Sequence, residues 1–329
     1  MATASAPGKA FLFGEHAVVY GEPALLCAID RRATATVERR DGTGATEVDR
    51  VEAPDLGDGG VEIRYDSGDE PGAGTATVEA GDGDAAEGLG YVTTALDRVR
   101  AAVGSEARFI VEVSSDLPVG AGLGSSAAVT VATVRAALAA LDTDAAPEEI
   151  AAMGHDVERG VQGAASPADT YASSVGGAVW VVPDEELRRL DADLRLAVAH
   201  DGTSASTAAM VEGVRRFREA TTTGERVVAT IGALAREGRA ALQDGDDATV
   251  GRLMDANHGL LSALGVSTAG LDELVWAARD AGADGAKLTG AGGGGSVVAL
   301  PGSEAVADGL HDVAASVHVG GLAEGVRLE

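Results

Sequence analysis

The order of apolar and polar positions predicts that the chain opens with strands. Apolar and polar side chains alternate over 4–38, a spacing typical of half-buried strands, around a polar turn at Gly14-Glu15-His16. Residues 107–114 alternate in the same way, whereas helical spacing runs over 91–103 and from Ala127 to Leu141. We therefore expect two or three strands, then a helix, a strand and a second helix.

Residues 41–90 interrupt this pattern, because Gly and Asp dominate them. Short β-like pieces at 61–65 and 75–78 stand between turn-forming runs, and we predict a solvated hairpin region without chemistry. Further along, Pro147 followed by two glutamates predicts a helix start, since proline fits the first turn and acidic residues favour the positive helix end. This helix should end near Gly163.

A domain boundary is predicted at Pro183-Asp184-Glu185, where one α/β unit gives way to the next. Before it we expect a loop over 163–174 and a strand over 176–182. After it come a strand at 194–200 and helical patterns at roughly 204–221, 225–243, 246–263 and 268–281. A glycine-rich turn, a strand, a helix and a final strand close the chain. The prediction is an α+β fold with two domains, 1–183 and 184–329.

Composition narrows the class of protein. Of the 329 residues, 45% are hydrophobic, which is enough to bury a sizeable core. The single cysteine, Cys27, excludes an intramolecular disulfide framework. Neither a signal peptide nor about 18 uninterrupted apolar residues can be found, so we expect a cytoplasmic protein without a membrane segment.

The chain is strongly acidic, and almost all of its basic residues are arginine. Asp and Glu number 52 against 25 Lys and Arg, a formal net charge of −27, which argues against nucleic-acid or anionic-membrane partners. Lys9 and Lys287 are the only lysines. Acidity, scarce lysine and few aromatic residues favour a protein adapted to very high salt, as in a halophilic archaeon. Codon bias in a GC-rich genome also replaces lysine by arginine, but it does not explain the excess of acids.

A glycine-rich turn between a predicted strand and a predicted helix carries the first candidate chemistry. It contains Pro118, Gly120, Ala121, Gly122, Leu123, Gly124, Ser125 and Ser126. Glycine lets the backbone approach an anion closely, and a helix N-terminus adds free N–H donors. A phosphate group fits such a turn, with one serine hydroxyl left to coordinate Mg²⁺. A turn of this kind can also serve close packing alone.

Two lysines and two carboxylates extend the candidate set. Lys9 and Lys287 each lie beside a glycine-containing turn in a chain that otherwise uses arginine, which suggests that these positions need a compact charge. Glu158 lies late in a predicted helix and Asp169 in the predicted loop after it. One carboxylate could hold Mg²⁺ and the other meet a substrate hydroxyl, as phosphoryl transfer requires, although a single carboxylate in so acidic a chain is more often a surface acid or a helix cap. No GxxxxGK[ST] loop or convincing GxGxxG dinucleotide turn is present.

Three motifs together resemble those of the GHMP small-molecule kinases. They are PGKAFLFGEHAVVYG at 7–21, LPVGAGLGSSAA at 117–128 and KLTGAGGGGS at 287–296. In order and spacing the resemblance covers the whole chain. It implies a ribosomal-S5-domain-2-like N-terminal domain and a ferredoxin-like C-terminal domain, with the active site in the cleft between them.

The resemblance also implies roles for individual residues. The turn over 118–126 would bind the phosphates of ATP, and Ser126 with Glu158 would hold Mg²⁺. Asp169 would accept the proton of the substrate hydroxyl, while Lys9 would stabilise the charge that develops on the transferred phosphoryl group. The residues implied on the substrate side are Lys9, Glu15, His16, Tyr20, Asp169, Thr203 and Gly292.

The motif GEHAVVYG at 14–21 is most similar to the motif of family members that act on mevalonate. The resemblance thus implies ATP-dependent phosphorylation of the C5 hydroxyl of (R)-mevalonate in isoprenoid biosynthesis, with mevalonate and ATP as partners and a homodimer as the common assembly. Two alternatives stay open: another GHMP kinase, acting on phosphomevalonate or a sugar, and a nucleotide-binding sensor without turnover. A second phosphate on the acceptor would require further basic residues, and the sequence offers no evident set.

Overall fold

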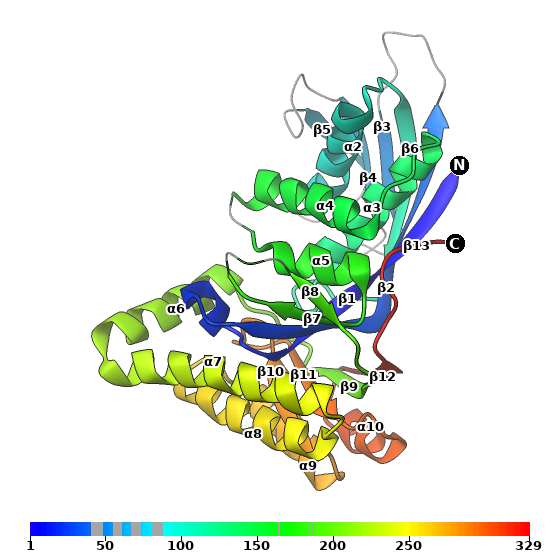
Figure 1. Ribbon diagram of the computed structural model, residues 1–329. Helices are drawn as coiled ribbons and strands as arrows, with labels where there is room; N and C mark the ends of the chain where they lie inside the picture. The colour runs from blue at the N-terminus through cyan, green and yellow to red at the C-terminus, as the bar shows by residue number, and fades with distance from the viewer. Residues whose placement is uncertain are drawn as a thin grey trace.

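The computed structural model describes residues 1–40, 49–54, 61–66, 74–80, 88–163, 165–183, 185 and 187–329. Within these ranges the chain forms two bodies, each a β-sheet carrying helices, as the α+β prediction requires (Figure 1). The larger body contains a nine-stranded sheet and the smaller one a four-stranded sheet. Of the Gly/Asp-rich region, the described parts are strands, and the runs between them lie outside the described residues.

The larger sheet is built around a long antiparallel hairpin of β1 and β2. Its order is β13-β1-β2-β6-β3-β4-β5, with β7 pairing β2 and β8 pairing β7. The strands span Ala2–Phe13 (β1), Ala24–Arg40 (β2), Asp49–Ala53 (β3), Val61–Asp66 (β4), Thr75–Ala80 (β5), Arg108–Ser115 (β6), Ala178–Val181 (β7), Arg188–Leu190 (β8) and Arg327–Leu328 (β13). The expected polar turn joins β1 to β2 and leads into a short 3₁₀ helix, η1 (Ala17–Tyr20).

Four helices form the layer that covers this sheet, with α4 packed on the other three (Figure 1). They span Gly90–Val103 (α2), Ser125–Ala140 (α3), Pro147–Gln162 (α4) and Pro167–Val175 (α5). Helix α3 is apolar on nearly every side because it is enclosed by the sheet and by α2, α4 and α5. The enclosed helix therefore fixes the turn that precedes it.

The expected loop over 163–174 is wrong from Pro167 onward, where the chain forms α5. Ser166 caps this helix by accepting a hydrogen bond from the Ala168 N–H at 3.2 Å, and Pro167 occupies the first turn. Small residues made the segment look like a loop. In the structure, Ala172 and Ser173 are fully buried, and their size lets α5 pack closely against α4 and β1.

The smaller body confirms the four helical patterns predicted for the second half. Its sheet has the order β10-β11-β9-β12, with every pair antiparallel. The strands span Arg195–His200 (β9), Gly285–Thr289 (β10), Ser296–Leu300 (β11) and Ser316–Gly321 (β12). The helices span Thr207–Ala220 (α6), Thr222–Gln243 (α7), Asp247–Ala263 (α8), Ala269–Asp280 (α9) and Glu304–His311 (α10). None of the helices that the described residues form combines the length and the apolar character that a bilayer span requires.

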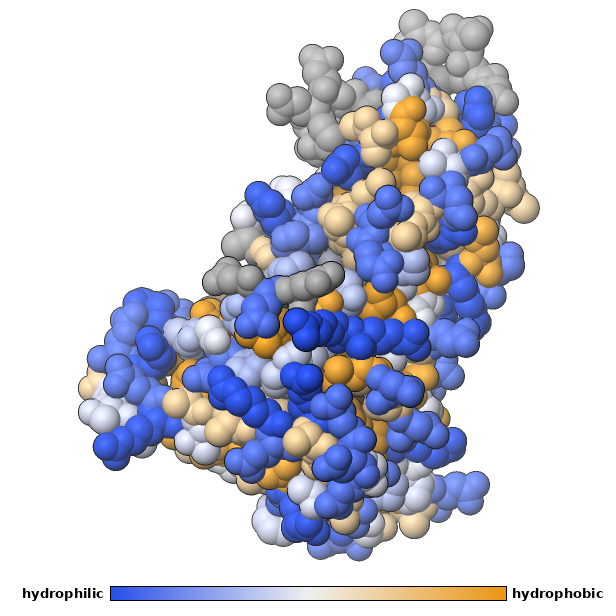
Figure 2. All heavy atoms as spheres, in the orientation of Figure 1, coloured by the Kyte–Doolittle hydropathy of each residue, from blue (hydrophilic) through white to orange (hydrophobic). Residues whose placement is uncertain are grey.

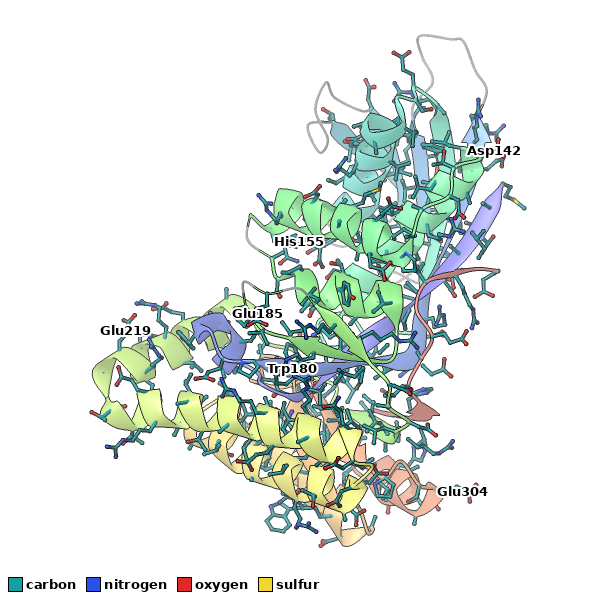
Figure 3. All side chains as sticks on the ribbon, in the orientation of Figure 1. Asp142, His155, Trp180, Glu185, Glu219 and Glu304 are labelled. Carbon is teal, nitrogen blue, oxygen red and sulfur yellow. The ribbon has the colours of Figure 1, made fainter. Side chains whose placement is uncertain are left out.

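The two bodies share one apolar core. Side chains of β9 alternate, so that Leu196 and Val198 pack in a cluster with Phe13 of β1, whereas Ala197 and Ala199 pack in a second cluster with the helices of the smaller body. At the edge of this junction the Trp180 ring of β7 lies 4.9 Å from the Arg239 guanidinium of α7 (Figure 3). The shared core fixes how the two bodies face each other.

The chain crosses back into the first sheet after the predicted boundary. Strand β8 pairs with β7, and the terminal strand β13 pairs with β1. The larger body thus contains short pieces of the region 184–329. The division into domains 1–183 and 184–329 stays a prediction.

Candidate active site

A cavity of about 960 Å³ lies where the two bodies meet. From the larger body it is lined by β1, η1, the glycine-rich turn, the N-terminus of α3 and the start of α5. From the smaller body the start of α6 and the turn between β10 and β11 contribute. The three motifs, far apart in sequence, therefore meet at one site.

The glycine-rich turn ends at Gly124, immediately before α3. Gly120, Gly122 and Gly124 have φ values of 72°, 77° and 73°, which favour glycine. A Cβ at Gly124 would lie 2.8 Å from the Lys9 Cγ, so a side chain has no room there. Helix α3 begins at Ser125, two residues before the predicted helical spacing, and the first N–H groups of a helix have no partner within it. The turn therefore presents backbone donors to the cavity.

Lys9 connects this turn to Asp169. Its Nζ lies 3.2 Å from the Asp169 Oδ2 and donates a hydrogen bond to the Gly122 carbonyl oxygen at 3.2 Å. Its backbone N–H donates to the Leu123 carbonyl at 2.8 Å. The Lys9 side chain is 6% exposed and that of Asp169 31% exposed, so the carboxylate is accessible from the cavity while the ammonium group is enclosed. Asp169 lies in the first turn of α5.

Ser126 and Glu158 form a second pair at the cavity. The Ser126 Oγ donates to the Glu158 Oε1 at 3.2 Å, and Glu158 is only 4% exposed. Burial raises the pKa of Glu158 to about 7, and the negative charge of Asp169 adds to this, whereas the Ser126 hydrogen bond and Lys9 oppose it. Within the described ranges, no lysine or arginine lies at ion-pair distance from Glu158.

A buried carboxylate without a cationic partner beside a serine hydroxyl suits a divalent cation. No group of three metal-ligating side chains occurs among the described residues. Mg²⁺ binds through one or two protein oxygens when substrate phosphates and waters supply the other ligands, so Ser126 and Glu158 fit this requirement.

Glu15 and His16 both line the cavity, in the turn after β1. Both Glu15 carboxylate oxygens are already bound: Oε1 pairs with the Lys287 ammonium group, and Oε2 accepts a hydrogen bond from the Asn257 amide at 3.1 Å. The His16 Nε2 lies 2.9 Å from the Ala291 carbonyl oxygen, and burial lowers the pKa of this imidazole. Lys287 is fully buried in β10 and does not itself line the cavity.

Tyr20, Thr203 and Gly292 are not among the described residues that line the cavity. The Tyr20 ring lies 4.6 Å from the Arg218 guanidinium of α6. Thr203 donates from both its N–H and its Oγ1 to the Asp201 Oδ1, at 2.8 Å each. Their assignment to the substrate stays a prediction.

The sequence did not indicate two residues that support the lining of the cavity. Asp201 directly follows β9, and its Oδ1 accepts the Gly295 N–H at 3.1 Å as well as the two Thr203 donors, so it joins the turn between β10 and β11 to the loop before α6. An Asp-Gly pair after a strand is a turn signal that could have indicated it. Asn257 is fully buried within α8, and the only sequence signal was a polar residue on the apolar face of a helix.

The comparisons with known proteins agree with this arrangement. Residues 90–177 match the GHMP kinases N terminal domain, and residues 239–317 match the GHMP kinases C terminal domain. The chain therefore belongs to the GHMP kinase family, and it is an ATP-dependent kinase that acts on an alcohol.

Within this family the chain is similar to mevalonate kinases over most of its length. It is 40% identical to that of Pyrococcus abyssi, covering 99% of this chain and 97% of the relative, and 43% identical to that of Thermococcus onnurineus, covering 90% and 88%. Its structure resembles L. major mevalonate kinase in complex with R-mevalonate, with a TM-score of 0.78, 25% identity and coverage of 99% and 96%.

Proposed function

We propose that this chain transfers the γ-phosphoryl group of ATP to the C5 hydroxyl of (R)-mevalonate. One observation carries the proposal: Lys9 joins the glycine-rich turn to the Asp169 carboxylate across the cavity. The turn suits the phosphates of a nucleotide, and the carboxylate suits a hydroxyl, so the two reactants would meet beside the ammonium group. The relatives with 40–43% identity over most of the chain are mevalonate kinases, which supports the choice of acceptor.

Asp169 is the proposed proton acceptor. Its carboxylate is accessible from the cavity and would receive the hydroxyl proton as the oxygen attacks phosphorus. Lys9, 3.2 Å away, would balance the negative charge that grows on the transferred group. Because Gly122 also binds the Lys9 ammonium group, its position is fixed relative to the phosphate turn.

ATP would bind with its phosphates at the N-terminus of α3, where N–H groups and the helix dipole favour anions. We further propose that Ser126 and Glu158 hold Mg²⁺ there. When bound, the metal would neutralise charge on the β- and γ-phosphate oxygens. Among the described residues, these two side chains are the ligands that we assign to the protein, which leaves the others to phosphates and waters.

The cavity favours mevalonate over a phosphorylated acceptor. Lys9 is the only lysine or arginine among the described residues that line it, and Lys9 already pairs with Asp169. A second phosphate would need additional cations or donors. The sensor alternative is disfavoured because both pairs, Lys9 with Asp169 and Ser126 with Glu158, are in place.

A coupled assay of ADP release tests the proposal. The purified chain is supplied with ATP and Mg²⁺ in molar KCl and offered mevalonate, phosphomevalonate, galactose or homoserine. We expect the highest kcat/KM with mevalonate and a 5-phosphorylated product by ³¹P NMR. A higher kcat/KM for another acceptor would assign a different substrate, and ATP binding without turnover on any acceptor would support the sensor.

A further inference from the structure

The second lysine of the chain is fully enclosed. Lys287 lies at the middle of β10, and its side chain is 0% exposed. Its ammonium group pairs with Glu15 and donates a hydrogen bond to the Phe11 carbonyl oxygen at 3.3 Å. The Lys287 ammonium group is therefore directed toward the end of β1 and the turn after it. It is not directed toward the glycine-rich turn, where we propose that the phosphates bind.

Glu15 is held from two elements of the smaller body. Lys287 of β10 binds one carboxylate oxygen, and the Asn257 amide of α8 donates to the other at 3.1 Å. All three side chains are buried, with Glu15 2% exposed and Asn257 fully enclosed. A buried charge is stable only when it is paired and hydrogen-bonded, so each member of this cluster depends on the others.

The residue after Glu15 has a strained backbone. His16 has φ 60° and ψ −42°, a conformation that residues other than glycine rarely adopt. Such strain persists only where the surrounding structure enforces it, and it is concentrated at functional sites. The His16 ring is fixed on its other side by the Ala291 carbonyl oxygen, and it lines the cavity.

The turn has little freedom to move as a unit. On its other flank, Gly14 has φ 97°, and a Cβ there would lie 2.5 Å from the Ala24 Cα. The Phe11 N–H also donates to the Thr289 Oγ1 at 2.7 Å, and Thr289 lies two residues after Lys287 in β10. The end of β1 is thus attached to β10 before the turn and to α8 and β10 within it.

We propose that Lys287 and Asn257 are positioning residues for the acceptor: by anchoring Glu15 they hold His16 in its strained conformation at the acceptor side of the cavity. Glu15 then acts as an anchor for the turn and not as a ligand of the substrate. The inference rests on the proposed function, since it takes mevalonate as the acceptor. Among the described residues, no hydrogen bond or ion pair joins Lys287, Glu15 or Asn257 to the glycine-rich turn, so we expect nucleotide binding to depend little on this cluster.

A set of variants separates positioning from general stability. Lys287→Met removes the cationic partner of Glu15, Asn257→Leu removes one hydrogen bond at similar volume, and the double variant Lys287→Met/Glu15→Gln removes both members of the ion pair. Arg100→Met is the matched control, because Arg100 is also buried and pairs with Asp49 at 2.9 Å, but it does not line the cavity. The measurements are KM for mevalonate, KM for ATP, kcat and the thermal midpoint.

We expect Lys287→Met to raise KM for mevalonate at least 10-fold and Asn257→Leu at least 3-fold, with KM for ATP within 2-fold of the unmodified chain. The double variant should recover at least 3-fold of the loss in Lys287→Met, because the unpaired carboxylate is gone. Arg100→Met should lower the thermal midpoint and leave both KM values within 2-fold.

The inference is overturned if Asn257→Leu folds and keeps its mevalonate KM, or if both KM values rise together in the cluster variants. It is also overturned if the double variant is no better than Lys287→Met. The unmodified chain is assayed first with the four acceptors named above. Failure to use mevalonate there refutes the proposed function, and the same KM comparison then proceeds with the acceptor that is used.

Discussion

Asp169 and Glu158 are both carboxylates at one cavity, yet their surroundings differ. Asp169 is partly accessible and lies 3.2 Å from the Lys9 ammonium group, whereas Glu158 is enclosed and contacts the Ser126 hydroxyl. The first environment favours proton exchange with a substrate. The environment of Glu158 disfavours a negative charge that has no cation beside it. A bound metal ion would supply that cation, so this environment suits a metal ligand.

Replacing Asp169 by asparagine tests the first assignment. Asn keeps the size of the side chain but cannot accept the hydroxyl proton, so kcat should fall by ~10²–10⁴-fold. The Kd for ATP, measured by calorimetry, should change little, because the phosphate turn is untouched. If kcat stays near that of the unmodified chain, Asp169 is not the proton acceptor.

Glu158 gives the metal-free protein a pH-dependent stability. Because its pKa is about 7 in the folded chain and 4.5 is its ordinary value, the folded state binds the proton more tightly than the unfolded state. The free energy of unfolding should therefore fall as pH rises from about 4.5 to 7, by on the order of 3 kcal/mol.

Urea unfolding with EDTA, from pH 5 to pH 8 at constant KCl, measures this effect. Glu158→Gln carries no titrating group, so the stability of this variant relative to the unmodified chain should increase with pH across that window. Groups that do not interact with Glu158 titrate equally in both proteins and cancel in the difference. A difference that does not change with pH would show that Glu158 is not the source.

At the scale of elements, the sequence located most helices and strands because each had its own periodicity and end signals. Helix α3 was predicted from apolar spacing that starts at Ala127, and in the structure it begins two residues earlier, at Ser125. Helix α5 was missed because its small residues have no helical period, although Ser166 and Pro167 are proper start signals. Size complementarity with α4 and β1 decides its structure, and a single sequence does not display that property.

The residues of the candidate site were likewise predictable where the local sequence indicated them. Lys9 and Ser126 lie in recognisable motifs, whereas Glu158 and Asp169 were predicted from their positions and the resemblance, and the structure brings the four together as Lys9 with Asp169 and Ser126 with Glu158. The partnership of Glu15 with Asn257 was not predictable, because 242 residues separate the two and nothing local in α8 indicates the turn after β1.

Substituting Gly124 tests how much the phosphate turn depends on glycine. In Gly124→Ala the residue must keep φ near 73°, and its Cβ would lie 2.8 Å from Lys9. We expect kcat/KM for ATP to fall at least 10-fold, because the turn and the Lys9 side chain must both shift. The control is Gly245→Ala, which has φ 69° and open space around its Cβ.

Both alanine variants should lose about 1 kcal/mol of unfolding free energy, the cost of a left-handed backbone without glycine. Only Gly124→Ala should lose activity, measured as initial rates over a range of ATP concentrations. Equal kinetics in the two variants would mean that the turn tolerates a side chain and does not approach the phosphates closely.

At the scale of the whole molecule, the acidic charge and the shared apolar core act in opposite directions. A net charge of −27 on one chain repels itself, and this repulsion favours expanded states. The core that joins the two bodies, with Phe13, Leu196 and Val198 among its members, resists expansion. Hydrophilic side chains cover much of the visible face of α6 and α7 (Figure 2).

Salt should therefore stabilise the protein and its active cavity. Raising KCl from about 0.1 M to 1 M shortens the screening length from about 10 Å to 3 Å, which removes most repulsion between neighbouring acids. We expect both the thermal midpoint and kcat/KM for mevalonate to rise over this range and on to higher KCl.

Sucrose at matched osmolality is the control, because it favours compact states without screening charge. An activity maximum at low salt, or an equal response to sucrose, would leave codon bias as the explanation for the missing lysines. Since the cavity is lined from both bodies, repulsion that loosens their contact should reduce activity at a lower temperature than it unfolds either sheet.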